Sequence, residues 1–184
     1  MKDKERIQKI KMIIMDVDGT LTDGSLLVLP DGEELKSYNV KDGTGILLAR
    51  LAGLKTAIIT GKISKSLEKR AEKLQITEVH QGILDKKRIL TEIQDKNDLK
   101  KEHIAYIGDD LGDLEVIKSV GLAAAVADAH PEIKKHCHFI CHNPGGKGAV
   151  REFIEFILEA QNKLEVISAK FKELSQQHLK KKAD

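Results

Sequence analysis

The sequence has no tryptophan, few aromatic residues and almost no net charge. Aromatic residues make up 3% of its 184 residues, and the formal net charge is +2. The core must therefore be aliphatic, built chiefly from Ile, Leu, Val and Ala, and the hydrophobic content of 41% is normal for a globular protein. Because basic residues gather only in short runs near the two ends, as in solvated termini, we expect no nucleic-acid partner.

Long apolar runs and a framework of cysteines are missing as well. No run approaches the roughly 18 residues that a membrane span needs, and no secretory apolar segment precedes the first expected strand. Cys137, His138, Cys141 and His142 lie within six residues, too close on an extended segment to converge tetrahedrally on zinc. An edge strand is the better interpretation. We expect a cytoplasmic protein without membrane contacts or disulfides, folded as one domain over residues 1–184.

A short apolar run ends in two carboxylates. The residues Met12–Met15 are typical of a buried strand, and Asp16, Asp18, Gly19 and Thr20 come near or at its end. On an extended backbone, the spacing i, i+2 puts Asp16 and Asp18 on the same side. Two acids at the end of a buried strand are unfavourable unless a cation or a reacting group lies between them. The sequence therefore predicts a metal-assisted site at this point.

Apolar strand patterns alternate with helical patterns along the chain, and this alternation predicts an α/β fold with a doubly wound parallel sheet. Strands are expected at 12–16, 55–60, 78–81, 104–107, 122–127 and 139–141, and helices at 42–51, 64–74, 85–95, 112–120, from 131, and from 149 towards the end. The last is a long C-terminal helix, whose heptad-like extension (about 159–182) either lies on its own domain or contacts another subunit. The segment 21–36 is expected to form a β-hairpin.

Polar residues follow three of the expected strands at their carboxyl ends, where ligands bind in such sheets. The acids are Asp16, Asp18, Asp109, Asp110 and Asp113. Ligation by oxygen alone selects a hard metal, and Mg²⁺ is the natural choice. An EF-hand is excluded, because its fifth and sixth loop positions hold Thr20 and Leu21. Thr60, Gly61, Lys62 and Lys86 add groups that bind an anion, so the set predicts phosphoryl transfer.

These motifs resemble those of the haloacid dehalogenase superfamily of phosphohydrolases. The matching segments are Asp16-Val17-Asp18-Gly19-Thr20, Ile58-Ile59-Thr60-Gly61, Lys86 and Gly108-Asp109-Asp110-Leu111-Gly112-Asp113. The resemblance implies that Asp16 is the nucleophile and that Asp18 transfers protons. It implies that Asp16, Asp109 and the Asp18 carbonyl hold Mg²⁺, while Asp110 and Asp113 orient the metal shell. Thr60, the Gly61 N–H and Lys86 would hold the phosphoryl oxygens.

Within that superfamily the chain is most similar to a small capless subfamily that dephosphorylates 3-deoxy-D-manno-octulosonate (KDO) 8-phosphate, a lipopolysaccharide precursor. Further matching segments include residues 21–24, 38–46, 81–86, 125–131 and 145–152. The resemblance implies a homotetramer in which the hairpin of one subunit completes a neighbour's site. It implies sugar contacts from Asn39, Lys41, Asp42, Gly43, Lys62 and Arg70.

The choice of sugar stays open at this stage. Lys62 and Lys147 stand where the subfamily usually has arginine, and lysine cannot make the bidentate pair of hydrogen bonds by which arginine binds a carboxylate. Lys73 is associated with relatives that act on nine-carbon, sialic-type 9-phosphates. We therefore expect a Mg²⁺-dependent KDO 8-phosphate phosphatase, with a nine-carbon sugar-acid phosphatase as the first alternative. A non-catalytic oligomerisation module is the more remote alternative, since a scaffold has no need for these acids.

Overall fold

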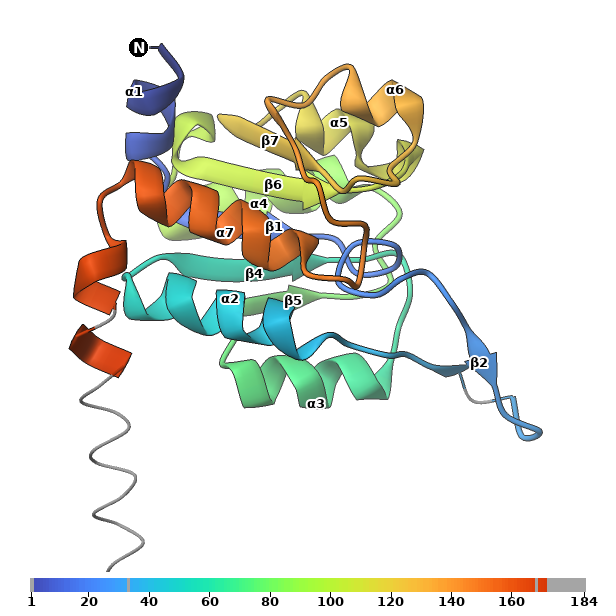
Figure 1. Ribbon diagram of the computed structural model, residues 1–184. Coiled ribbons are helices and arrows are strands. Elements are labelled where there is room, and N and C mark those ends of the chain that lie inside the picture. The colour runs from blue at the N-terminus through green and yellow to red at the C-terminus, as the bar shows by residue number, and fades with distance from the viewer. Residues whose placement is uncertain (1, 33, 168, 172–184) are drawn as a thin grey trace, which may run out of the picture.

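The structure, a computed structural model, describes residues 2–32, 34–167 and 169–171. Its centre is a six-stranded parallel sheet with the strand order β5-β4-β1-β6-β7-β8 (Figure 1). The strands are β1 (Met12–Met15), β4 (Lys55–Ile59), β5 (Glu78–His80), β6 (Ile104–Gly108), β7 (Leu122–Ala125) and β8 (Phe139–Ile140). The expected parallel sheet is confirmed, including the short edge strand at the second cysteine.

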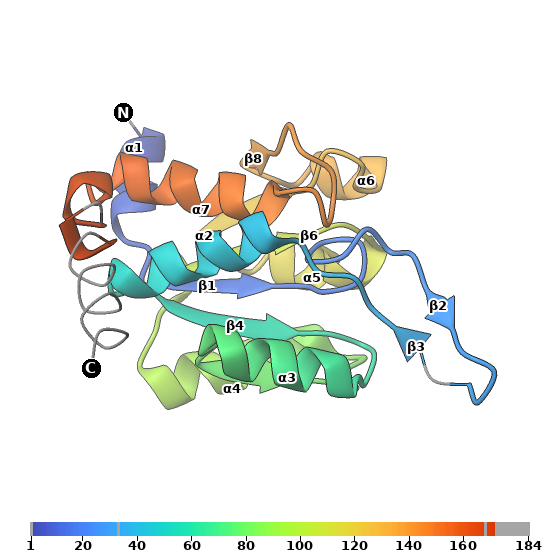
Figure 2. The same ribbon diagram turned by 60° about the horizontal axis from the view of Figure 1, so that its bottom comes forward.

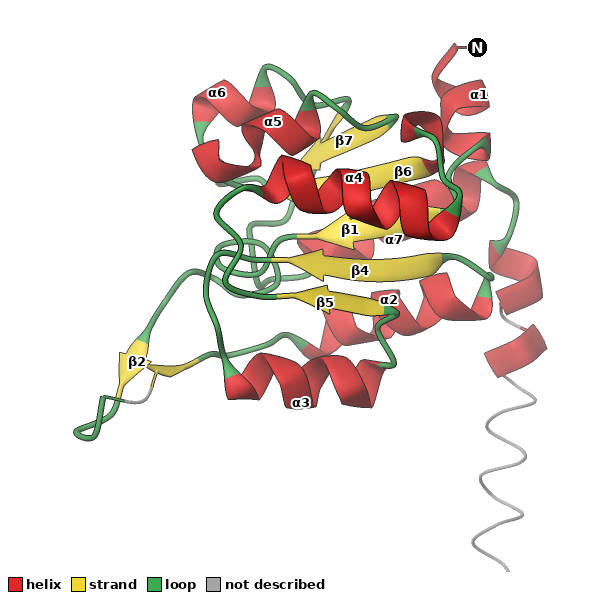
Figure 3. Ribbon diagram, turned by 180° about the vertical axis from the view of Figure 1, so that it is seen from behind, coloured by secondary structure: helices red, strands yellow, loops and turns green. Residues whose placement is uncertain are grey.

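Helices cover both faces of this sheet. They are α1 (Lys2–Gln8), α2 (Val40–Leu51), α3 (Lys65–Leu74), α4 (Lys86–Asn97), α5 (Leu114–Ile117), α6 (Pro131–Lys134) and α7 (Ala149–Ala160), with 3₁₀ turns η1 (Lys101–His103) and η2 (Leu111–Asp113). Helices α2 and α7 pack side by side on one face, and α4 lies on the other with α5 beside it (Figures 1 and 3). Helix α3 runs along the β5 edge. None of the described helices has the length and apolar character to span a membrane.

The core is aliphatic, as the composition predicts. Every residue of β1 is fully buried, and so are the apolar residues of β4, β6 and β7 on either side. Tyr106 and Phe153 are the largest side chains of the described part of the chain that are fully buried. A central parallel strand covered by helices on both faces accepts only apolar side chains, which is why four apolar residues occur in succession here.

The segment between β1 and α2 forms the expected hairpin, with the antiparallel strands β2 (Leu27–Val28) and β3 (Glu34–Leu35). It projects from the carboxyl ends of the sheet strands and away from the rest of the molecule (Figure 2). Leu27 and Val28 are 61% and 59% exposed. No larger insertion appears in the described part of this segment, so the site has no cap domain in this region.

The expectation of one continuous helix from residue 149 towards the end is wrong. Helix α7 ends at Ala160, and a turn separates it from the helical residues 164–167 and 169–171. Asn162 adopts a left-handed conformation (φ 54°), while Lys163 N–H donates to the Leu158 carbonyl at 2.9 Å. This is a Schellman cap, which asparagine tolerates and which terminates a helix. Helix α7 packs on its own domain; the expected extension beyond residue 171 lies outside the described residues.

The register of the sheet brings the polar strand ends together. Met15 is paired with Ile58 of β4 on one side and with Ile107 of β6 on the other. Asp16, the next residue, therefore lies level with Ile59 and Gly108, one residue before Thr60 and Asp109. Three segments far apart in the sequence thus end at one edge of the sheet, as expected for ligand sites in open parallel sheets.

Candidate active site

Three carboxylates meet at the carboxyl ends of β1 and β6. Asp16, Asp109 and Asp113 each have an oxygen within 4.8 Å of the others. Asp16 and Asp113 are 5% and 2% exposed, and Asp109 is half-buried. The chain approaches closely at this point, because a Cβ on Gly19 (φ 88°) would lie 2.1 Å from an Asp109 oxygen. Glycine is therefore required next to the acids, both for space and for its backbone conformation.

Lys86 joins two of these acids. It is the first residue of α4, and its Nζ lies 2.5 Å from Asp16 Oδ1 and 2.7 Å from Asp113 Oδ1. The side chains of all three residues are at most 10% exposed. Buried ion pairs are favourable only with good geometry and further hydrogen bonds, and Asp113 has these. Its carboxylate also accepts the Tyr106 hydroxyl at 2.5 Å and the Asp109 N–H at 3.0 Å.

The electrostatics of this cluster favour a bound cation. Burial and the charge of Asp113 raise the pKa of Asp16 from 3.8 to about 8, against the attraction of Lys86. Burial and the same charge raise the pKa of Asp109 to about 6. Burial lowers the pKa of Lys86, but the charges of Asp16 and Asp113 together raise it above its ordinary value. One ammonium therefore does not neutralise the three acids.

The donor set fits Mg²⁺. It is made of hard oxygen atoms gathered within a few ångströms, with neither sulfur nor imidazole among the three clustered residues. Asp16 and Asp109 have the remaining capacity to ligate, because the oxygens of Asp113 already accept bonds from Lys86, Tyr106 and two backbone N–H groups. That Asp113 orients the metal shell stays a prediction, which these bonds support. Asp110 is exposed and accepts the Leu111 N–H at 2.8 Å, so it caps the turn η2.

The second acid of the first motif has a partner that sequence reasoning missed. Lys36, directly after β3, places its Nζ 2.6 and 2.7 Å from the two oxygens of Asp18. The Lys36 side chain is 2% exposed and that of Asp18 is 28% exposed. Nothing in the spacing of the sequence relates these residues, because the hairpin lies between them.

The expected phosphate-binding residues follow β4. Thr60 is 1% exposed, its N–H donates to the His80 carbonyl at 3.0 Å, and its carbonyl accepts the Ile83 N–H at 3.0 Å. Gly61 is exposed, and a Cβ there would approach nothing closer than the Ile83 carbonyl oxygen at 3.7 Å, so the backbone is open to a ligand. Lys62 is also exposed and pairs with Glu34 of the hairpin at 3.3 Å.

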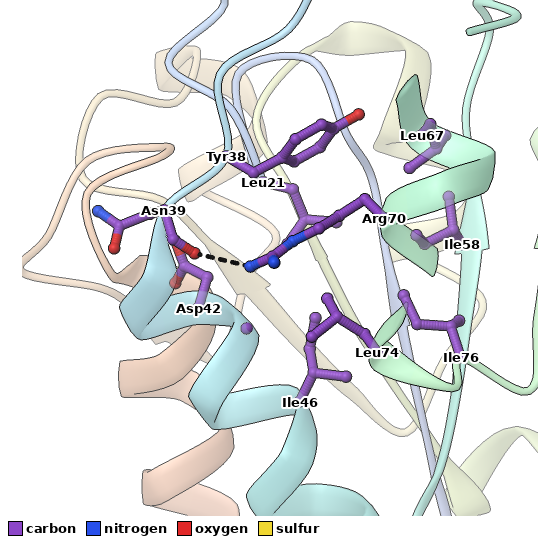
Figure 4. Close-up of a pocket in the computed structure, with 11 residues that line it drawn as sticks. Leu21, Tyr38, Asn39, Asp42, Ile46, Ile58, Leu67, Arg70, Leu74 and Ile76 are labelled. Atoms are coloured by element: carbon purple, nitrogen blue, oxygen red, sulfur yellow. Dashed lines mark hydrogen bonds between the residues drawn. The ribbon is translucent and has the colours of Figure 1, made fainter. Parts of the chain in front are cut away.

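Most of the expected sugar-binding residues surround a small cavity between α2 and α3 (Figure 4). Asn39, Asp42, Gly43 and Arg70 line it together with apolar side chains, and its volume is about 10 Å³. Arg70 points across it and donates to the Asn39 carbonyl at 3.3 Å. This space has about the volume of one water molecule and cannot hold a sugar acid. The other two of the six residues do not line it: Lys41 is exposed on the first turn of α2, and Lys62 is exposed beside Gly61.

The Asp42 side chain binds the start of a neighbouring helix. It is 1% exposed, and its carboxylate accepts the N–H groups of Gly148 at 3.2 Å and Arg151 at 3.0 Å. These groups begin helix α7, whose own N-cap residue provides no side-chain bond. Asp42 thus caps a neighbouring helix, where a carboxylate is favoured by the unpaired N–H groups. Its carboxylate faces this helix end and not the solvent, which does not favour the expected contact with a sugar.

Comparisons with known proteins agree with this geometry. Residues 75–154 match the family model of haloacid dehalogenase-like hydrolases. The 3-deoxy-D-manno-octulosonate 8-phosphate phosphatase of Yersinia pestis is 45% identical over 161 residues, which cover 88% of this chain and 86% of the relative. The relative from Escherichia coli K12 is 42% identical over 87% of this chain and 85% of its own length. The chain belongs to this phosphatase family.

Solved structures of the KDO 8-phosphate phosphatase family have the same fold. The Yersinia pestis enzyme superimposes with a TM-score of 0.86, at 45% identity and 88% coverage of both chains. The Moraxella catarrhalis enzyme, solved in complex with magnesium ion, phosphate ion and KDO, has a TM-score of 0.89 at 36% identity, covering 92% of this chain and 98% of that one. The family assignment and the Mg²⁺ expectation drawn from the motifs are therefore confirmed.

Two residues at the site of this family member were not identified from the sequence. Lys36 could not be found by spacing, because its contact with Asp18 depends on the path of the hairpin. Tyr106 carried a signal: a tyrosine within a fully apolar buried strand must place its hydroxyl against an acceptor. The structure identifies that acceptor as Asp113.

Proposed function

We propose that this phosphatase hydrolyses KDO 8-phosphate to KDO and phosphate. The observation that carries the proposal is the buried cluster of Asp16, Asp109, Asp113 and Lys86 at the carboxyl ends of β1 and β6. It occurs in a chain that is 45% identical to a KDO 8-phosphate phosphatase over 88% of its length. A cytoplasmic place in lipopolysaccharide sugar synthesis follows from the same substrate.

In the proposed mechanism, a carboxylate oxygen of Asp16 attacks phosphorus and the bond from phosphorus to the sugar oxygen breaks. Asp18 gives its proton to the leaving oxygen, which departs as the sugar hydroxyl. Water then attacks the phosphorus of the aspartyl phosphate and gives a proton to Asp18. Asp16 is released as a carboxylate together with inorganic phosphate. Each acid thus returns to its starting state after one turnover.

The remaining residues bind and orient. Lys86 is held between Asp16 and Asp113, where its ammonium can also meet a phosphoryl oxygen. The exposed Gly61 N–H and the Thr60 hydroxyl at the end of β4 are proposed to bind the other phosphoryl oxygens. Mg²⁺, when bound by Asp16, Asp109 and the Asp18 carbonyl, supplies positive charge that offsets the repulsion between the carboxylates and the phosphate. Asp113 and Asp110 hold the loop that presents Asp109.

We also propose that the chain is a single phosphohydrolase domain that assembles as a homotetramer, with the hairpin of one subunit over the site of the next. The support is exposed apolar surface. Leu27 and Val28 project on the hairpin, while Ile63 and Leu84, beside the phosphate-binding residues, are 77% and 93% exposed. Apolar groups this exposed commonly mark an interaction surface.

The substrate is tested by phosphate release from KDO 8-phosphate and from a nine-carbon sialic-type 9-phosphate, with and without Mg²⁺. A higher kcat/KM for KDO 8-phosphate supports the proposal, and the reverse order supports the nine-carbon alternative, for which Lys73 in a groove with Arg50 and Arg70 would supply positive charge. Asp16→Asn should remove activity. A wild-type protein inactive on every sugar phosphate tested would favour the assembly module.

The hairpin is tested by mixing two inactive variants. One is Asp16→Asn, which has an intact hairpin, and the other lacks residues 26–35 but keeps its acids. If the hairpin acts on a neighbouring subunit, mixed tetramers regain part of the activity, because some sites combine intact acids with an intact hairpin. If it acts within its own subunit, no activity returns. Light scattering of the wild type gives the number of subunits.

A further inference from the structure

Lys36 is a buried cation at the base of an exposed hairpin. Its neighbours Leu35 and Ser37 are exposed, yet the Lys36 side chain is 2% exposed and ends on Asp18. The Lys36 ammonium binds both oxygens of the carboxylate, because Nζ lies 2.6 Å from one oxygen and 2.7 Å from the other. A different ion pair of the hairpin, Lys62 with Glu34, has a distance of 3.3 Å and both side chains are more than 40% exposed.

The two ion pairs differ in how firmly they hold their side chains in one orientation. An exposed pair such as Lys62 with Glu34 is screened by water and fixes little. Lys36 is withdrawn from water, so its ammonium depends on Asp18 to satisfy its charge, and the pair has few alternative geometries. Asp18 has no other side-chain partner among the hydrogen bonds of the described residues. The orientation of its carboxylate is therefore determined mainly by Lys36.

We propose that Lys36 is a positioning residue that holds the Asp18 carboxyl group in the orientation needed for proton transfer. This inference rests on the proposed phosphatase activity and adds a residue to it. Asp18 must face the leaving oxygen in the first step and the water in the second, and a carboxylate free to rotate would often face neither. In its protonated form Asp18 has one O–H donor and an acceptor oxygen, so it can accept from the Lys36 ammonium and still donate to the leaving oxygen. As a carboxylate it has about four acceptor positions, which leaves room for the attacking water beside Lys36.

The proposal is tested first by steady-state kinetics on KDO 8-phosphate with the variants Lys36→Met and Lys36→Arg. Methionine has a similar length without charge, and arginine keeps the charge. A matched control is Lys55→Met, because Lys55 also donates a hydrogen bond, to Asn97 at 2.7 Å, but at the opposite end of β4. General acid–base catalysis contributes about 10²–10⁴-fold, so partial loss of orientation should lower kcat by roughly 10–100-fold in Lys36→Met.

The remaining expectations separate positioning from other roles. KM should stay within about threefold, Lys36→Arg should recover part of kcat, and Lys55→Met should match the wild type. An unchanged kcat in Lys36→Met overturns the proposal. A raised KM at unchanged kcat also overturns it, because Lys36 would then bind the phosphate directly. Should Lys36→Met not fold, Lys36→Gln, which keeps a neutral donor, takes its place in every comparison.

A second readout depends on the leaving group. The leaving group of p-nitrophenyl phosphate needs little proton donation, so the first release of p-nitrophenol by Lys36→Met should be slowed much less than single-turnover cleavage of KDO 8-phosphate. Equal slowing with both substrates would overturn the proposal, since a general distortion of the site has that effect. Loss of the proposed function itself is recognised separately, because the wild type would then release no phosphate from the sugar substrate.

Discussion

Replacing Asp42 with alanine would separate a structural role of this carboxylate from a role in sugar binding. In the structure the side chain is buried and accepts the Gly148 and Arg151 N–H groups at the start of α7. The variant leaves both donors without this partner at a buried helix end. If Asp42 instead contacts the substrate, as the motif resemblance implies, the same variant should change KM and leave stability nearly unaltered.

The magnitude follows from the two lost bonds. A buried donor left unsatisfied costs about 1–3 kcal/mol, so losing the partner of both donors should lower the free energy of unfolding by about 2–6 kcal/mol. For a chain of this size, each 1 kcal/mol lowers the melting temperature by about 2–4 °C. Asp42→Asn should lose less, because it keeps one acceptor. The buried charge is also unfavourable in itself, since burial raises the pKa of Asp42.

Urea unfolding followed by circular dichroism measures this loss, provided that the slope of the transition stays constant. Asp95→Ala is the matched control, because Asp95 is an exposed aspartate on α4, and such changes usually stay within about 0.5 kcal/mol. At temperatures where the variant is folded, kcat/KM on KDO 8-phosphate should stay near that of the wild type. A loss of stability no larger than that of Asp95→Ala, together with a raised KM, would refute the capping role.

Three further predictions concern the site and the packing beneath it. In the metal-free protein the pKa values of Asp16 and Asp109 are raised, so the folded state holds protons that the unfolded state has lost, and the melting temperature should fall from about pH 5 to 8. Mg²⁺ should reduce this fall, and Asp16→Asn should weaken it. A pH profile in Asp16→Asn identical to that of the wild type would contradict the raised pKa of Asp16. Tyr106→Phe removes the hydrogen bond that the Tyr106 hydroxyl donates to Asp113, so it should lower stability by about 1–2 kcal/mol in urea unfolding and reduce kcat. If neither stability nor kcat changes, this hydrogen bond is unimportant. Gly45→Ala places a Cβ 2.7 Å from the backbone of α7, so thermal melting should show a loss of about 1–3 kcal/mol in stability, although alanine is the better helix former. A stabilised variant would contradict the close packing of α2 on α7.

Much of the fold could be predicted from the sequence because its elements carry local signals. The run of four apolar residues before Asp16, and the similar runs before Thr60 and Asp109, are typical of buried parallel strands, and the structure places β1, β4 and β6 there. The convergence of the acids followed from topology alone, since parallel strands present their carboxyl ends at one edge. The extent of the last helix was wrong, because an asparagine in a left-handed cap outweighed the heptad-like spacing.

The side-chain partners at the site depend on tertiary structure. Asp42 and Asp18 occur in motifs that resemble those of a phosphatase, but only the packing of α7 against α2 turns Asp42 towards a helix end. Likewise, only the path of the hairpin brings Lys36 to Asp18. The physical reason is the range of the interactions. Strand and helix patterns depend on residues a few positions apart, so the sequence by itself determined the order of elements and the edge where the acids meet. Ion pairs and caps join residues 18 to more than 100 positions apart, and these contacts were decided by the folded chain.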